Sequence, residues 1–181
     1  VDLDEELVAA FNERAPGGAR GVVGDARELS LAQSFGLVLA PMQLLQLLEG
    51  ADDRALCLRR TARHLRPGGL AAFAIVDSPP EAIEAPPPMP DGREVDGWVY
   101  SSLPLDAAVR DGEIVVRRLR QTVSPAGELT EEVDEVRLGL LSAETVEREA
   151  AAAGLRPAGR REIRPTEDHV GSTVVLLEKG A

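Results

Sequence analysis

Few side chains in this sequence combine the chemistry and the location expected of a catalytic group. His169 follows Glu167 and Asp168, in a segment that we expect to join the last two strands. An imidazole titrates near neutral pH, so we treat His169 as a candidate general base. His64 stands in the predicted last turn of a helix, where positive charge is favourable, and we interpret it as structural. Two histidines and one cysteine do not form a metal-binding constellation.

Two aromatic side chains are candidates for contacts with a substrate. Trp98 and Tyr100 are two residues apart in a predicted strand, so they share one face of it. The chain has only five aromatic residues of the Phe, Trp and Tyr types. This pair is compatible with the wall of a substrate pocket and equally with a small local core, and the sequence leaves both interpretations open.

The stretch from Leu56 to Val76 indicates which fold must position these residues. Leu58, Ala62 and Leu65 recur at helical spacing, and Pro67 followed by two glycines ends that helix. The apolar run that follows is typical of a strand covered on both faces. Helix, turn and buried strand together predict an α/β sheet. Ligands of such sheets bind beyond the carboxyl ends of the strands, which here means just after Ala40 and Val76.

Composition narrows the class of protein. A chain of 181 residues with 44% hydrophobic and 28% charged residues is long enough for one α/β domain with a small appendage. A net charge of −11 argues against nucleic acid as a partner. No apolar run approaches the length of a membrane span, so we expect no membrane partner. A single cysteine, Cys57, allows no internal disulfide, which is typical of a cytoplasmic protein.

The remaining pattern predicts the order of elements along the chain. We expect helices over residues 4–15 and 142–153, the second capped by Ser142, and a short apolar helix or turn over residues 42–48. Leu7, Val8 and Phe11 should share one face of the first helix, and Asp52 should cap the helix before Pro67. We expect strands over residues 20–23, 35–40, 98–109 (broken by Pro104), 113–123, 129–140, 157–163 and 170–178. The strands 113–123 and 129–140 should form a hairpin around Ser124–Gly127. Six prolines between Pro79 and Pro90 predict an irregular stretch over residues 77–94.

Together these features predict the organisation of the whole chain. Residues 1–78 and 141–181 form an α/β core with a Rossmann-like, mostly parallel twisted sheet, flanking helices and an antiparallel last strand. Residues 79–140 form a Pro-rich linker and a small antiparallel β insertion, which we call the lid. The sequence does not fix the oligomeric state, and a homodimer formed through two such lids is compatible with it.

In order and spacing, four segments resemble the class I S-adenosylmethionine-dependent methyltransferases. These are Val1-Asp2 with its following helix, Gly24-Asp25-Ala26, the strand Phe35–Ala40 with Pro41, and Leu65–Gly69. The closing helix and strand pair also fit that family. The resemblance covers nearly the whole chain, although no single motif in it is very specific.

The resemblance implies S-adenosyl-L-methionine as the cofactor and assigns residues to it. Asp2 with Leu3 would hold the ribose, because a carboxylate can accept bonds from two hydroxyls. Asp25 with Ala26 would bind adenine, and Ala40 and Met42 would lie near the sulfonium. From the residues alone, Asp2 is equally a helix cap, Asp25 a turn residue and Met42 a wall residue.

The chain departs from the family pattern at its beginning. In the family, a strand and a glycine-rich loop precede the position of Asp2, and this sequence shows neither. Such a unit needs about 30 residues. We therefore expect the sequence to be N-terminally incomplete and to lack part of the cofactor site.

The leading functional hypothesis is methyl transfer to an O, N or C nucleophile of a small molecule held under the lid. A nicotinamide-dependent oxidoreductase is the weaker enzyme hypothesis, since it needs a Tyr-Lys pair and Lys179 is the sole lysine. The third hypothesis is a non-catalytic, methyltransferase-like scaffold that has lost cofactor binding. Cofactor binding discriminates the first hypothesis from the third.

Overall fold

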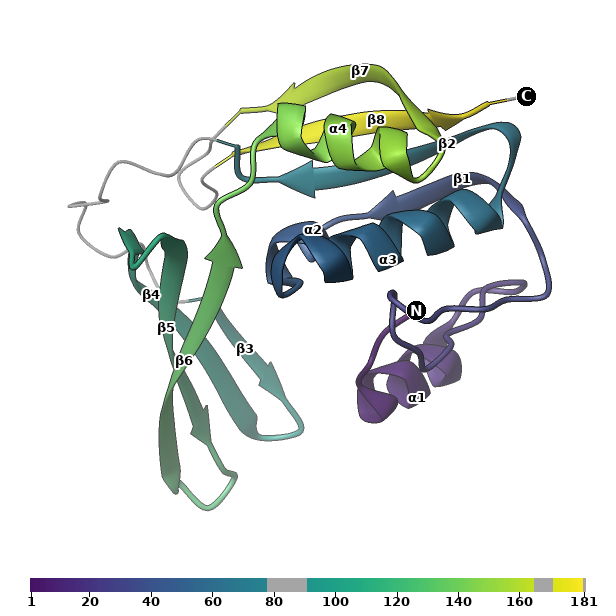
Figure 1. Ribbon diagram of the computed structural model, residues 1–181. Helices are drawn as coiled ribbons and strands as arrows, with labels where there is room; N and C mark the ends of the chain where they lie inside the picture. Colours follow the sequence, from purple (N-terminus) through teal and green to yellow (C-terminus); the bar gives the residue numbers. More distant parts are fainter. Residues whose placement is uncertain (78–90, 165–170, 181) are drawn as a thin grey trace.

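A computed structural model describes residues 1–77, 91–164 and 171–180, which contain four helices and two separate four-stranded sheets (Figure 1). In chain order the elements are α1 (Glu5–Arg14), β1 (Phe35–Ala40), α2 (Leu44–Leu47), α3 (Gly50–His64), β2 (Leu65–Ile75), β3 (Asp91–Val95), β4 (Trp98–Arg110), β5 (Glu113–Val123), β6 (Leu129–Gly139), α4 (Ala143–Ala152), β7 (Leu155–Ile163) and β8 (Ser172–Lys179). The predicted α/β class is confirmed.

The first sheet, which we call the core sheet, has the strand order β1-β2-β8-β7. β1 and β2 pair in parallel, whereas β8 is antiparallel to both of its neighbours. The expected antiparallel last strand is therefore present, but the expected mostly parallel pairing is only partly met among the described residues. The reason is that β8 inserts between β2 and β7 in the reversed direction, so that both of its ladders become antiparallel.

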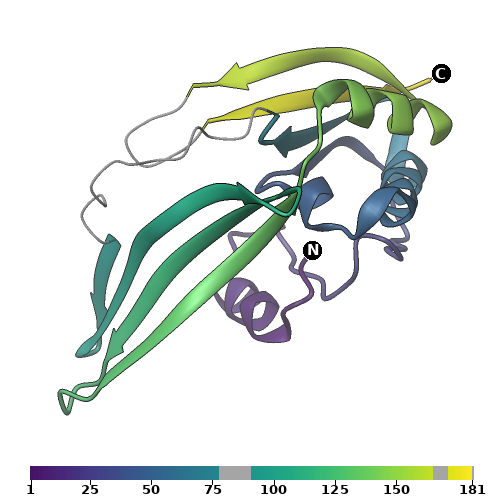
Figure 2. The same ribbon diagram turned by 60° about the vertical axis from the view of Figure 1, so that its left-hand side comes forward.

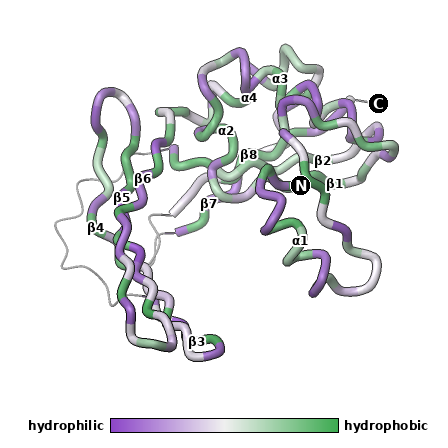
Figure 3. The backbone as a smooth tube through the Cα atoms, turned by 90° about the horizontal axis from the view of Figure 1, so that it is seen from below, coloured by the Kyte–Doolittle hydropathy of each residue, from purple (hydrophilic) through white to green (hydrophobic). Residues whose placement is uncertain are grey.

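Helices α2, α3 and α4 supply one hydrophobic core against the core sheet. Alternate residues of β2, namely Ala71, Phe73 and Ile75, are at most 1% exposed and face these helices. Figure 3 shows the corresponding apolar stretches along β2 and β8. Helix α4 begins as predicted, because the Ser142 side chain accepts a hydrogen bond from the Thr145 N–H at 3.2 Å.

Strand β1 forms one edge of the core sheet among the described residues. It pairs with β2 on one side, and no ladder on its other side occurs in residues 1–77, 91–164 and 171–180. Val38 packs against the core, whereas Leu37 and Leu39 are 53% and 65% exposed. This strand therefore presents an open backbone edge and exposed apolar side chains.

The second sheet contains β3, β4, β5 and β6 in that order, all antiparallel. The predicted hairpin around Ser124–Gly127 is confirmed, and Pro104 lies at a register shift in a continuous β4. Residues up to 94 were expected to be irregular, and this is wrong for residues 91–94. They belong to β3 (Asp91–Val95), which pairs with residues Trp98–Ser102 of β4. Figure 2 shows this long, curved sheet extending away from the core sheet.

The first 30 residues differ most from the sequence prediction. Residues 20–23 do not form a strand, and only Val23 makes an isolated parallel bridge, to Asp2. Helix α1 buries Val8 as expected, but Leu7 and Phe11 are 61% and 46% exposed. In Figures 1 and 2, α1 lies apart from the core sheet, and it contacts instead the segment at Gly21, whose N–H donates to the Asn12 side chain at 2.7 Å.

The prediction of a short helix or turn over residues 42–48 is confirmed, because Met42 and Gln43 form a turn with φ of 61° and 58° and helix α2 spans Leu44–Leu47. One prediction about a helix end needs correction. Asp52 lies inside the first turn of α3, whose N-cap residue is Glu49. None of the helices in the described part of the chain is long and apolar enough to cross a bilayer.

Candidate active site

A cleft of about 680 Å³ runs along the open edge of β1. Its walls are the first three residues, the segment from Gly24 to Leu31, strand β1 itself, and the facing sides of α2 and α3. A volume of this size suits a small molecule or nucleotide-like cofactor. Most of the strand and helix residues at the cleft are apolar, while its carboxylates come from Asp2, Asp25, Glu49 and Asp53.

Asp2 lies at the mouth of this cleft and is not the cap of the first helix. Its Oδ1 accepts a hydrogen bond from the Asp4 N–H at 3.0 Å. The Asp4 carboxylate itself caps α1, accepting from the N–H groups of Glu6 and Leu7 at 2.8 and 2.9 Å. The bridge to Val23 then holds the Asp2 backbone beside Gly24, whose N–H donates to the Asp2 carbonyl at 2.9 Å. Asp2 is thus free to present its second carboxylate oxygen to a ligand.

Asp25 is held by a neighbouring arginine that the sequence analysis did not single out. Arg27 donates to both Asp25 oxygens, at 2.6 to 3.0 Å, and also reaches Asp53 at 2.6 Å. These hydrogen bonds from Arg27 lower the pKa of Asp25, and the two carboxylates raise the pKa of Arg27. A ligand amine that binds Asp25 must therefore compete with Arg27. The i, i+2 spacing of the two residues was visible in the sequence, but their contact was not.

The remaining expected cofactor residues divide into two groups. Leu3, Ala26 and Ala40 line the cleft, as do Asp2 and Asp25. Met42 does not line it, and its side chain is 76% exposed beyond the end of β1. The left-handed turn at Met42 explains this placement, because it redirects the chain as soon as β1 has ended.

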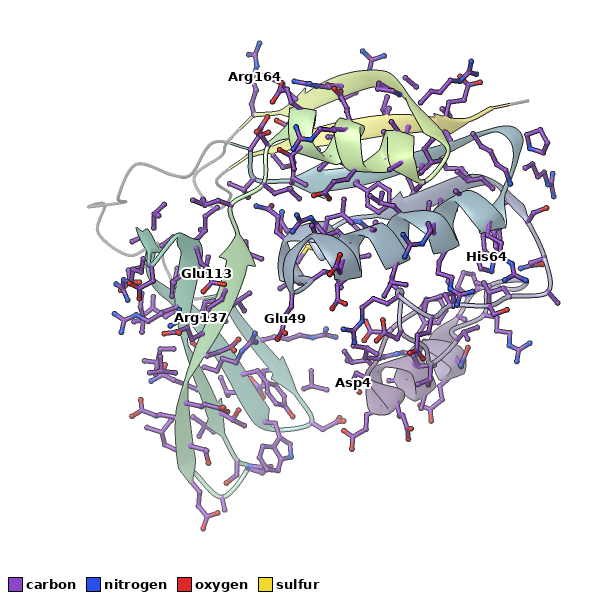
Figure 4. All side chains as sticks on the ribbon, viewed as in Figure 1. Asp4, Glu49, His64, Glu113, Arg137 and Arg164 are labelled. Carbon is purple, nitrogen blue, oxygen red and sulfur yellow. The ribbon has the colours of Figure 1, made fainter. Side chains whose placement is uncertain are left out.

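His64 anchors the wall that carries Asp25. Its Nδ1 donates to the Arg60 carbonyl at 2.7 Å, and its Nε2 accepts from the Leu31 N–H at 2.8 Å. The ring is only 4% exposed, and both nitrogens are used. Figure 4 shows His64 and Glu49 at opposite ends of α3, which forms one side of the cleft. This geometry supports the structural interpretation of His64.

Cys57 also lines the cleft but is poorly suited to act as a nucleophile. Its side chain is 2% exposed, and burial raises the pKa of its thiol to about 11. Within the described residues no group of three or more His, Cys, Asp or Glu side chains is arranged to hold a metal ion. The chemistry available at this cleft is therefore recognition by carboxylates within apolar walls.

Trp98 and Tyr100 lie on the second sheet, near the β3–β4 turn. Their rings stack with a centroid distance of 6.5 Å and an interplanar angle of 20°. Both are partly exposed, and Tyr100 borders a shallow hollow with Arg93 and Arg120. The structure confirms that they share a strand face, but it does not place them in the cleft along β1. His169 lies outside the described residues.

Comparisons with known proteins identify one matching family model and several similar solved structures. Residues 1–73 match the family model described as a methyltransferase domain. DesVI from Streptomyces venezuelae has a similar structure, with a TM-score of 0.72 and 18% identity over 99% of this chain and 72% of that chain. The sugar N-methyltransferase KedS8 from Streptoalloteichus sp ATCC 53650 also has a similar structure, with a TM-score of 0.74 and 17% sequence identity over 99% of this chain and 69% of that chain.

A third similar structure was determined with its cofactor. This is SAM-bound CalS10, an amino pentose methyltransferase from Micromonospora echinaspora, with a TM-score of 0.68 and 17% identity over 98% of this chain and 71% of that chain. No curated protein matches the sequence. The chain thus matches a methyltransferase-domain model over residues 1–73, and its fold is similar to that of these methyltransferase structures.

Proposed function

We propose that the protein transfers a methyl group from S-adenosyl-L-methionine to a nucleophile of a small molecule. One observation carries the proposal: every residue that lines the cleft along β1 falls within residues 1–73, the segment that matches the methyltransferase domain. Three further features support it, namely the size of the cleft, its carboxylates and its extension to Ala40 at the carboxyl end of β1.

The residues of the cleft fit the cofactor group by group. Asp2 would accept hydrogen bonds from the ribose hydroxyls, with Leu3 beside it. Asp25 would accept from the adenine amine once Arg27 has moved toward Asp53, and the Ala26 N–H would reach the ring. Leu37, Leu39 and Ala40 would exclude water from the reacting end.

The bound cofactor supplies a methyl group on a positively charged sulfonium. The acceptor's lone pair forms a bond to that methyl carbon while the carbon–sulfur bond breaks, and the electron pair stays on sulfur. The acceptor then loses a proton to a base or to water. Most of the catalytic effect in such a displacement comes from alignment and exclusion of water, so the protein's task is to position the acceptor. We propose His169 as the base that receives the proton.

For the acceptor, we propose that residues 79–140 act as a lid over a core made of residues 1–78 and 141–181, with Trp98 and Tyr100 contacting the substrate. The similar structures include enzymes described as methyltransferases of a sugar nitrogen, an amino pentose and a glycopeptide nitrogen. Amino sugars are therefore the first acceptors to test. Arg93, Arg120 and Asp91 beside Tyr100 would offer polar contacts to sugar hydroxyls.

The test is an assay of methyl transfer with isotopically labelled S-adenosylmethionine and a panel of amino sugars, phenols and carboxylic acids. We expect a labelled, monomethylated product and one equivalent of S-adenosylhomocysteine from at least one acceptor. Cofactor binding without transfer to any acceptor would refute the acceptor class. Absence of cofactor binding both to this chain and to a version that includes any native upstream residues would refute the proposal and favour the non-catalytic scaffold.

A further inference from the structure

Gln46, in α2, is a buried amide that connects the core sheet to the second sheet. Its Oε1 accepts a hydrogen bond from the Val76 N–H at 2.6 Å. Its Nε2 donates to the Val76 carbonyl at 3.2 Å and to the Gly139 carbonyl at 3.0 Å. Val76 directly follows β2 and Gly139 ends β6, so one side chain joins the ends of strands from two different sheets.

The chemistry of this junction requires an amide at position 46. Gln46 is 3% exposed, and its oxygen meets a donor while its NH₂ group meets two acceptors. The reverse orientation would place an oxygen against two carbonyl oxygens, which fixes the assignment of the two atoms. An aliphatic side chain would leave these backbone groups of Val76 and Gly139 without this partner in a buried place, which is costly.

Among the described residues, two further contacts lie at this junction. Val76 forms a small buried cluster with Ile114 and Leu138, at the same end of the sheet as Gly139. Asp77 accepts a hydrogen bond from the Ala143 N–H at 3.2 Å, close to where the chain returns to the core. In Figures 1 and 2 the sheet extends away from the core beyond this end. A small rotation at the junction would therefore displace its far end by a large distance.

The backbone of Gln46 also closes the turn that follows β1. Its N–H donates to the Gln43 carbonyl at 2.8 Å. Met42 and Gln43 are both in the left-handed region, which is unfavourable for residues other than glycine and persists only where the surroundings impose it. Leu44, Leu47 and Leu48, on either side of Gln46, line the cleft along β1. Gln46 thus ties the cleft wall to the orientation of the second sheet.

We propose that Gln46 is a positioning residue that fixes the second sheet relative to the cleft along β1 and so sets the approach of the methyl acceptor. It touches neither substrate nor cofactor and acts through Val76, Gly139 and the turn after β1. The part of this inference that concerns turnover rests on the proposed function. The part that concerns the position of the sheet does not, and it can be measured in the absence of any ligand.

The position of the sheet can be measured between two spin labels in the full chain. Ala126→Cys places one label in the β5–β6 turn, and Arg148→Cys places the other on α4; both native residues are exposed. Cys57 is buried and should not react. We expect one narrow distance distribution in the parent protein and a clearly broader one after Gln46→Leu. Gln33→Leu, the same change at an exposed residue, is the matched control and should leave the distribution narrow.

Gln46→Glu keeps the inference testable if Gln46→Leu fails to fold. A neutral carboxyl group can accept from Val76 and donate to Gly139, whereas a carboxylate would face two carbonyl oxygens. We therefore expect the distribution of distances between the two spin labels in Gln46→Glu to narrow as the pH falls, with no such change in the parent protein. A distribution that stays narrow at every pH in folded Gln46 variants would overturn the inference.

The rate of methyl transfer provides the second test. We expect Gln46→Leu to lower kcat for methyl transfer by about 10- to 100-fold, the range that a small misalignment of reactants can produce. The dissociation constant for S-adenosylhomocysteine should change by less than about threefold, because Asp2 and Asp25 are untouched. If Gln46→Leu broadened the distance distribution but left kcat unchanged, the inference would also be overturned. If the parent protein transfers no methyl group, the proposed function fails, and the distance measurement alone decides the role of Gln46.

Discussion

Asp2→Asn and Asp4→Asn form a matched pair of substitutions that tests whether Asp2 binds the cofactor. Each replaces a carboxylate by an amide of nearly the same size, and the two positions are two residues apart at the start of α1. In Asp2→Asn the Oδ1 that accepts from the Asp4 N–H is retained, so the local backbone should stay in place. Only the negative charge and one acceptor oxygen are lost.

The expected effect follows from the value of charge-assisted hydrogen bonds. Hydrogen bonds to a charged group contribute about 1.5 to 3 kcal/mol. Asp2 is exposed, so the lower half of this range applies best. Losing about 1.5 to 2 kcal/mol weakens binding of S-adenosylmethionine about 10- to 30-fold. Asp4→Asn should change the affinity less than about twofold, because Asn caps a helix as well as Asp does.

Isothermal titration of S-adenosylmethionine and S-adenosylhomocysteine into the three proteins measures these changes, with circular dichroism as a check that all are folded. Equal affinities for Asp2→Asn and the parent would refute the role of Asp2. Equal losses in Asp2→Asn and Asp4→Asn would indicate that the start of α1 matters only as a structural unit.

Three further predictions concern the cleft, the pH dependence of stability and the cap of α4. Arg27→Gln removes the guanidinium that donates hydrogen bonds to Asp25. We therefore expect the affinity for S-adenosylhomocysteine, measured by titration calorimetry, to rise about two- to fivefold. A loss of affinity would show that Arg27 itself binds the cofactor. The pKa of Asp25 is lowered in the folded protein, so its contribution to stability is present above the unfolded pKa of about 4 and is lost as the pH falls through the folded pKa. Asp25→Asn should therefore lower the unfolding temperature at pH 7, and the difference from the parent should shrink as the pH falls below about 4. A difference that grows on acidification would contradict this assignment. Ser142→Ala removes the cap of α4 and should cost about 1 kcal/mol, or about 2 to 4 °C in thermal unfolding, whereas Ser30→Ala, at an exposed loop residue, should cost little.

The homodimer with which the sequence is compatible remains untested. Sedimentation velocity of the protein should give a particle of twice the chain mass if it is correct, and a single species of one chain mass over the accessible concentrations would contradict it.

Features with local causes were predictable from the sequence. Ser142 was identified as a cap from its position before an apolar helical pattern, and Gly127 with Pro125 identified the hairpin turn. The register shift at Pro104 within the continuous strand β4 also follows from proline's missing N–H. These signals lie within a few residues of the structure that they determine.

Features that depend on contacts between distant residues were not predictable. Gln46 is an unremarkable glutamine in an apolar stretch until the fold brings Val76 and Gly139, 30 and 93 residues away, to its side chain. The bridging of Asp25 and Asp53 by Arg27 depends on where α3 packs, because 26 residues separate Arg27 from Asp53. The exposure of Leu7 and Phe11 likewise depends on what lies next to α1, which periodicity cannot report.

The central claim is that the cleft along β1 binds S-adenosylmethionine, and hydrogen–deuterium exchange with and without the cofactor tests it most directly. We expect the cofactor to slow exchange in Val1–Leu3 and Gly24–Arg27, the segments that carry Asp2 and Asp25, and to leave most of β4–β6 unchanged. Protection confined to the second sheet, or no protection in either segment at saturating cofactor, would contradict the account.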